Sequence, residues 1–506
     1  MKDFDAIVIG AGNGGLTAAA TLQRGGLKTL LLERHNIPGG CATSFVRGPY
    51  EFEVALHQLS GMGTPDKPFI LRKLFADLGI MDKVDFVEEP ELYRMIIPGI
   101  IDITLPASVV GVARTLKQYF PKESRAIDDF LELCKFVTLE SIMVLPRARK
   151  AVDKEMLRHQ GKNFAKYGLK PAQQVFDEFF DDEMIKAVLG AYWGYLGLPL
   201  RELSFADMGA LFYAYAEFKP YHVIGGSQAL SNALLDSFLE AGGEMRFNCA
   251  VDKILTESSA VRAVRTEQGD EITCHTIVSN ASSLHTYNEL LDVSNRVELV
   301  REDFKSRRLG VSAFVIYLGL DCTPEQLGVT AATNFIVLTP DDEAVFRRAE
   351  TLDEPLGCGF TCYNVDDPSF APEGKSIASL ICIQYGDVWK NVAPDDYVNT
   401  KYAFAEKLLD LAETVFPNIR SYIEEVEIAT PLTMMRYLNT PGGAIYGFDQ
   451  NRLDSSLFRE RYKEIDGLYL AGAWSGMGGF QPTYQAGVSV ANSIIRTQIY
   501  RDKANV

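Results

Sequence analysis

A glycine-rich turn near the start of the chain has the residue types and the spacing that bind a phosphate group. The apolar residues 6–9 precede it, and the pattern Gly-x-Gly-x-x-Gly is completed by Gly10, Gly12 and Gly15 before a helix-forming run. Between a strand and a helix, these glycines permit a tight turn, close approach of a pyrophosphate, and packing of the helix on the strand. The next apolar run ends at Glu33, whose carboxylate can accept hydrogen bonds from ribose hydroxyls. The sequence therefore predicts an α/β fold with a dinucleotide site.

Two further glycine-rich turns indicate which dinucleotide is bound. The tetrapeptide Pro-Gly-Gly-Cys at 38–41 stands where an NAD-dependent dehydrogenase would continue into another strand and helix. Backbone without side chains permits close approach of a ligand that extends beyond its AMP half. Near the C-terminus, the turn 472–479 separates an apolar strand at 468–471 from a helix expected to begin near Pro482. One long ligand that contacts both turns accounts for them together, and FAD is such a ligand.

Composition excludes several classes of protein. The chain has 506 residues, 47% hydrophobic and 23% charged, which is typical of a globular protein large enough for two domains. A formal net charge of −17 argues against nucleic acid as a partner. The eight cysteines form no C-x-x-C pair and no histidine stands at metal-ligand spacing, so we expect reduced thiols and no bound metal. The start of the sequence has no signal-peptide pattern and no apolar run is long enough to span a bilayer, so we expect a cytoplasmic protein.

Six stretches, in order from residue 7 to residue 480, resemble the phytoene desaturase, carotenoid isomerase and retinol saturase branch of the amine-oxidase-like flavoproteins. They are IVIGAGNGGLTAAATL, LERHNIPGGCATSF, YEFEVALHQLSG, VIGGSQALSNALLDSFLEAGGEMRFNCAVDKI, TPLTMMRYLNTPGGAIYGF and GLYLAGAWSGMGGF. The resemblance implies a Rossmann-like FAD-binding domain with an inserted substrate domain of mixed sheet and helices. It also implies hydride transfer between flavin N5 and a carbon–carbon double bond of an apolar polyene, isoprenoid or lipid. Saturation, desaturation and cis/trans isomerisation all stay open.

The resemblance assigns parts of FAD to particular residues. Val251 would pair its backbone with the adenine, and the 472–479 turn would approach the ribityl chain and the ring. The N-terminus of the last helix would stabilise an anionic reduced flavin. Many relatives follow the glycine pair with arginine, whereas this chain has Cys41, as retinol-saturase-like sequences do. The implied cofactor-binding residues are Gly10, Gly12, Asn13, Gly14, Gly15, Glu33, Arg34, Gly39, Gly40, Cys41, Val251, Gly472, Gly478 and Gly479.

His57 and Cys41 are the candidates for proton transfer. The resemblance implies that both lie near the flavin ring, flanked by a loop that carries Tyr437 and Tyr446. A histidine can serve as an acid or a base near neutral pH, although a structural hydrogen bond is an equally good explanation of His57. The two tyrosines are more often cavity walls than catalysts. The sequence has no Ser-His-Asp order and no paired-carboxylate motif that would indicate another chemistry.

The chain is expected to form two discontinuous domains. The FAD-binding domain would comprise 1–75, 220–290 and 430–506, and the substrate-binding domain would comprise 76–219 and 291–429. Apolar periodicity in stretches such as RAIDDFLELCKFV predicts a mainly helical 76–219. Alternating apolar runs in VSAFVIYLGL and KSIASLICIQY predict strands in the second insert, and YAFAEKLLDLAETVF predicts its final helix.

One segment departs from the acidic composition. Eight Lys or Arg and only two acids occur within it, with Arg147 as the first basic residue and Lys170 as the last. The spacing predicts one helix with a basic face, opposite a mostly apolar one, that is either simply solvated or in contact with anionic lipid at a membrane surface. The basic residues at intervals of four are Lys154, Arg158, Lys162, Lys166 and Lys170, and the opposite face would carry Met156, Leu157, Phe164 and Tyr167.

Two other functions are compatible with this fold. A non-catalytic lipid carrier is one, because relatives that escort prenylated proteins share the architecture, but the intact glycine turns and Glu33 disfavour it. A flavin amine oxidase is the other, and it is disfavoured by the Gly-Gly-Cys sequence and by the lack of an evident aromatic cage in GAWSGMGGF.

Overall fold

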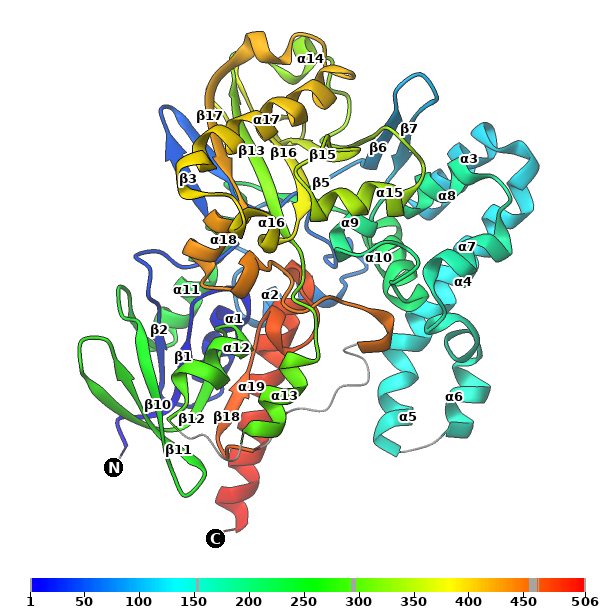
Figure 1. The fold of residues 1–506 in the computed structure, drawn as a ribbon. Coiled ribbons are helices and arrows are strands. Elements are labelled where there is room, and N and C mark those ends of the chain that lie inside the picture. Colours follow the sequence, from blue (N-terminus) through cyan, green and yellow to red (C-terminus); the bar gives the residue numbers. More distant parts are fainter. Residues whose placement is uncertain (1, 152–153, 293–296, 455–461, 463, 505–506) are drawn as a thin grey trace.

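The computed structural model describes residues 2–151, 154–292, 297–454, 462 and 464–504. Within these residues the chain builds two seven-stranded sheets, one at the lower left of Figure 1 and one at the top. A group of helices from the first half of the chain lies on the right of the same view. No described helix is both long and apolar enough to cross a bilayer.

The first sheet is built around two short parallel strands close to the N-terminus. β1 pairs with β2 on one side and with β12 on the other, and β18 pairs with β12, all in parallel. Every residue of β2 is buried, as expected for a parallel strand covered on both faces. Helix α1 (Asn13–Arg24) packs against α11 (Gly226–Glu240) and α19 (Phe480–Ala504). The strands are β1 (Phe4–Ile9), β2 (Thr29–Leu32), β9 (Glu244–Arg246), β10 (Val251–Glu257), β11 (Ala260–Thr266), β12 (Glu271–Ser279) and β18 (Leu468–Leu470).

The second sheet is mostly antiparallel, and its order is β17-β13-β16-β15-β14-β6-β7. The predicted strands at VSAFVIYLGL and KSIASLICIQY are confirmed as β13 and β16, which pair directly. The predicted helix is confirmed as α17 (Tyr397–Glu413), and its Phe404 ring packs 4.8 Å from that of Phe314 in β13. The strands are β6 (Glu91–Ile97), β7 (Ile101–Pro106), β13 (Ser312–Leu320), β14 (Thr333–Val337), β15 (Gly357–Cys362), β16 (Ser376–Gln384) and β17 (Ile423–Ala429).

The prediction of a mainly helical 76–219 is confirmed, except that residues 86–106 form strands. This part forms β5 (Phe86–Glu88), β6 and β7, and β6 joins the second sheet by pairing in parallel with β14. The β6–β7 hairpin turns at Gly99, whose φ of +75° suits glycine. The domain boundaries themselves stay a prediction.

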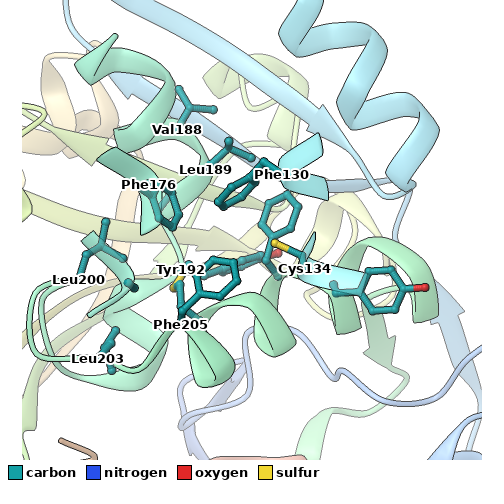
Figure 2. Close-up of a cluster of buried hydrophobic side chains, with 14 of the residues drawn as sticks. Phe130, Cys134, Phe176, Val188, Leu189, Tyr192, Leu200, Leu203 and Phe205 are labelled. Atoms are coloured by element: carbon teal, nitrogen blue, oxygen red, sulfur yellow. The ribbon is translucent and has the colours of Figure 1, made fainter. Parts of the chain in front are cut away.

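Helices fill the rest of that insert and form their own aromatic core. Figure 2 shows Phe130 of α4 (Ser124–Met143) among side chains of the other helices. Its ring lies 4.8 Å from that of Phe176 and 5.8 Å from that of Phe205. The other helices are α3 (Val109–Tyr119), α7 (Ala172–Phe179), α8 (Glu183–Gly190), α9 (Trp193–Leu196) and α10 (Phe205–Phe218).

The prediction of a single basic helix around 147–170 is wrong. The structure has α5 (Leu145–Ala151), α6 (Lys154–Gln160) and a turn of π-helix (Phe164–Gly168), while residues 152–153 lie outside the described residues. The buried carboxylate of Glu140 accepts the backbone N–H of Phe164 at 2.6 Å, which folds the chain back onto α4. The break at Gly161 prevents one continuous basic face, and Arg158 and Lys170 form ion pairs with Glu155 and Glu178.

Candidate active site

A cavity of about 1480 Å³ connects the two sheets. Its lining extends from the ends of β1 and β2 to α8 and α9, so it draws on residues from both ends of the sequence. Cavities of about 300–1,000 Å³ are enough for one drug-sized ligand. The volume therefore leaves room for a dinucleotide and a second molecule beside it.

All but one of the site residues predicted from the sequence line this cavity. Gly15 is the exception, because a Cβ atom there would lie 1.9 Å from the carbonyl oxygen of Gly10, so this glycine serves the packing of α1 on the turn. Tyr437 and Tyr446 line it as well, although Tyr437 lies in helix α18 (Pro431–Leu438) and not in a loop. The predicted residues brought together are Gly10, Gly12, Asn13, Gly14, Glu33, Arg34, Gly39, Gly40, Cys41, His57, Val251, Gly472, Gly478 and Gly479.

The first glycine turn is a cradle that only glycine permits. Gly12 caps the N-terminus of α1, so the first N–H groups of that helix are available to an anion. A Cβ atom on Gly12 would lie 2.8 Å from the side-chain nitrogen of Asn280, and one on Gly14 would lie 2.5 Å from the backbone nitrogen of Gly472. The turn at the start of the chain is therefore packed directly on the turn near its end.

Glu33 is held in place by the backbone of both neighbouring turns. One carboxylate oxygen accepts the N–H of Ala11 at 2.7 Å, and the other accepts the N–H of His35 at 2.8 Å. The side chain is buried and lines the cavity. Since each carboxylate oxygen can accept more than one hydrogen bond, Glu33 can bind ribose hydroxyls while it stabilises the glycine turn.

The turn at 38–41 is braced in the same way. Gly39 has a φ of +124° and donates its N–H to the carbonyl of Ala11 at 2.8 Å. A Cβ atom on Gly39 would lie 2.0 Å from the carbonyl oxygen of Ala42, to which the Ser231 hydroxyl of α11 donates. This turn therefore cannot move away from the first one to admit a side chain.

Arg34 contacts a different part of the chain. Its guanidinium donates to the carbonyl oxygens of Arg436 and Tyr437 at 2.7 and 2.9 Å, at the end of α18. The ring of His35 stacks on that of Tyr437 at 6.0 Å. Arg34 and His35 thus connect α18 to the part of the cavity that Glu33 lines.

Sequence reasoning missed Asn280. It follows β12, and its backbone N–H donates to the carbonyl of Ile9 at the end of β1. Its side chain lies against Gly12, Gly14 and Gly472 and lines the cavity. The available signal was its place directly after a buried apolar strand, because ligands bind at the carboxyl ends of parallel strands.

A second helix begins at the same cavity. The helix predicted near Pro482 is confirmed as α19, which starts at Phe480, two residues earlier. The cavity lining includes the whole first turn of this helix. The side-chain oxygen of Asn13 is buried without a partner among the described residues, as expected of a group that awaits a ligand. Two helix N-termini and three glycine turns therefore face one space, which suits a dinucleotide with a second polar ring system.

His57 and Cys41 are both uncharged at neutral pH. The His57 ring nitrogen Nδ1 lies 2.9 Å from the Thr361 hydroxyl in β15, and burial lowers the pKa of the imidazole to about 4. Burial, together with the charge of Glu53, raises the pKa of the Cys41 thiol to about 11. A neutral imidazole can accept a proton and a thiol can donate one, so the two can serve opposite directions of transfer.

Aromatic and aliphatic side chains surround the space beyond His57. The Tyr195 ring lies 6.3 Å from His57 and 5.7 Å from Phe335 of β14. Tyr446 lines the cavity against Gly478, where a Cβ atom would lie 2.6 Å from its Cα. No group of His, Cys, Asp or Glu among the described residues is placed to hold a metal ion.

A family model described as flavin containing amine oxidoreductase matches residues 14–495. The chain belongs to this family. FAD is therefore the cofactor, and the cradle formed by the glycine turns, Glu33 and the two helix N-termini fits it. The protein is an FAD-dependent oxidoreductase.

Several relatives of this flavoprotein share most of its length. It is 26% identical to the all-trans-retinol 13,14-reductase of Danio rerio, over 99% of this chain and 87% of the relative. It is 25% identical to the chloroplastic prolycopene isomerase of Daucus carota, over 93% and 76% of the two chains. It is 27% identical to the neurosporene-forming phytoene desaturase of Rhodobacter capsulatus, over 94% and 91%.

A solved structure confirms the fold. An oxidoreductase from Methanosarcina mazei superimposes with a TM-score of 0.64 at 19% identity, over 96% of this chain and all of the other. The α/β class and the FAD-binding architecture predicted from the sequence are therefore correct.

Proposed function

We propose that this flavoprotein acts on a carbon–carbon double bond of an apolar, conjugated lipid of the retinoid or carotenoid type. The observation that carries the proposal is the continuity of the cofactor cradle with an apolar, aromatic compartment in one cavity. The three relatives are, by their names, a reductase of all-trans-retinol, an isomerase of prolycopene and a desaturase of phytoene. The proposal leaves open whether the double bond is saturated, formed or isomerised.

Bound FAD supplies hydride chemistry, and the residues of the chain supply position and proton transfer. Tyr195 and Phe335 offer flat apolar surfaces against which a planar polyene can stack. His57 is neutral and its Nδ1 lies 2.9 Å from the Thr361 hydroxyl, so a proton taken from the substrate would stay on the imidazole only transiently, because burial disfavours its charged form. Cys41 retains its proton and can donate it in the direction of saturation. The role of either residue in catalysis is part of the proposal.

The test is to incubate the FAD-loaded protein anaerobically with all-trans-retinol, phytoene and prolycopene. The flavin is chemically reduced in one series and oxidised in a second. Saturation would oxidise the reduced flavin and raise the product mass by two hydrogens, and desaturation would do the reverse. Isomerisation would change retention time without a change of mass or a net change of flavin state. The proposal fails if no alkene changes while the same preparation oxidises primary amines and releases hydrogen peroxide.

A further inference from the structure

The cavity has a second end, far from the adenine side. This end lies between α8 and α15 (Asp342–Arg347), which Figure 1 places well away from β2 and β10. Glu183 lines it with a side chain that is 67% exposed, so the cavity reaches the surface here. We call this end the α8–α15 mouth. Its charged lining residues are Glu183, Lys186, Asp341, Asp342, Glu343 and Arg348.

Lys186 is the buried cation of the mouth. Its side chain is 9% exposed, and its ammonium donates to Asp177 at 2.6 Å and to Glu183 at 2.9 Å. Both carboxylates are more exposed than the lysine, so they lie on the outer side. An ammonium group has three donors, and no third acceptor is found for Lys186 among the described residues. A polar atom of a ligand in the cavity would complete its coordination.

The charge of the mouth limits which polar group that can be. Four of the six charged lining residues are acidic and two are basic, which gives a formal charge of −2. A carboxylate or phosphate on the ligand would meet net repulsion there. A neutral hydroxyl or carbonyl oxygen can accept from Lys186 without that repulsion.

Resting on the proposed function, we propose that Lys186 hydrogen-bonds the neutral polar end of an otherwise apolar substrate at the α8–α15 mouth. The apolar chain then extends inward past Trp193 and Tyr195 toward His57. Lys186 is thereby a specificity-determining residue, because fixing one end of a polyene selects which double bond lies beside the cofactor. A hydrocarbon without a polar end would bind without a fixed position along the cavity.

The test compares three ligands that differ only at one end. They are all-trans-retinol, all-trans-retinoic acid, and the hydrocarbon in which a methyl group replaces the terminal CH₂OH. Each is titrated into the FAD-loaded protein, and dissociation constants are measured by quenching of protein fluorescence. We expect wild type to bind retinol about tenfold more tightly than the hydrocarbon, which is about 1.4 kcal/mol, because the hydrocarbon cannot accept a hydrogen bond from the charged lysine. We expect Lys186→Met to remove that preference and to leave the hydrocarbon within about twofold of wild type.

Lys390→Met is the matched control. Lys390 pairs with Asp387 at the same three-residue spacing as Lys186 with Glu183, but it does not line this cavity. This variant should bind all three ligands like wild type. If Lys186→Met weakens all three ligands equally, or keeps the preference for retinol, the assignment is wrong.

Glu343→Lys provides a second and independent test that does not depend on folding of the Lys186 variant. It changes the formal charge of the mouth from −2 to 0, so retinoic acid should bind at least about threefold more tightly while the hydrocarbon is unaffected. An unchanged affinity for retinoic acid would contradict the electrostatic argument. If wild type binds none of the three ligands, the proposed function itself fails, and this assignment fails with it.

Discussion

The two halves of the cavity differ in what gives them their shape. The cofactor half is lined by the glycine turns, and the substrate half is lined by residues of α8, α9 and the second sheet. In the cofactor half, Cβ atoms on Gly14 and Gly39 would collide with backbone atoms at 2.0–2.5 Å. In the substrate half, a Cβ atom on Gly194 would meet nothing within 4 Å. Backbone shape defines the first half, and the choice of side chains defines the second. A cofactor of constant shape thus leaves a glycine signature in the sequence, whereas a substrate does not.

The largest expected effect is in the cofactor half. Gly12→Val should abolish retention of FAD, because a Cβ atom there lies 2.8 Å from Asn280 and the branched side chain would fill the space of the pyrophosphate. The measurement is the flavin content per chain after gel filtration, with circular dichroism as a check on folding. Gly194→Ala is the control and should stay fully flavinylated. A folded Gly12→Val protein that keeps its flavin would refute the cradle.

The converse change is Gly194→Trp in the substrate half. The indole has open space to enter, so the variant should fold and bind FAD like wild type while it excludes a polyene from the cavity. We expect the affinity for all-trans-retinol to fall by at least about tenfold, which is about 1.4 kcal/mol. Equal retinol binding in Gly194→Trp and Gly194→Ala would show that the ligand lies elsewhere.

An intermediate effect is expected for the residue that links the glycine turns. Glu33→Ala removes an acceptor shared by the backbone N–H groups of Ala11 and His35, together with the hydrogen bonds that it would accept from the ribose hydroxyls. The affinity for FAD should fall by roughly 1–3 kcal/mol. Reconstitution of the apoprotein, followed by flavin fluorescence, measures it. An unchanged dissociation constant would mean that Glu33 serves the turn alone.

The smallest effect concerns His57 and pH. Burial holds its pKa near 4 in the folded protein, below the ordinary value of 6.5, so only the unfolded chain takes up a proton between pH 6.5 and 4. The free energy of unfolding should therefore fall by about 1–2 kcal/mol through His57 as the pH drops from 7 to 5. Urea denaturation of His57→Gln should show a decrease smaller by that amount. Identical decreases in the two proteins would mean that His57 is protonated in the folded state.

The sequence predicted the parts of the molecule whose signals are local. The strand–turn–helix at β1 and α1, the strands β13 and β16 and the start of α19 follow from glycine spacing and apolar periodicity. Asn280 and the parallel pairing of β6 with β14 depend on contacts between distant segments, which no local pattern contains. The prediction of one basic helix was wrong for the same reason. Glu140 of α4 accepts a hydrogen bond from the backbone N–H of Phe164, and this contact ends the helical periodicity of the basic segment. The roles of His57 and Cys41 stay a prediction.

The central claim is that FAD and an apolar polyene lie side by side in one cavity. The most direct measurement is an anaerobic titration of the FAD-loaded protein with all-trans-retinol, followed through the visible absorption band of the flavin. The account predicts a saturable change of that band with one ligand per chain in wild type, and no change in Gly194→Trp. Retinol that binds wild type without altering the flavin band, or that alters it equally in Gly194→Trp, would contradict the account.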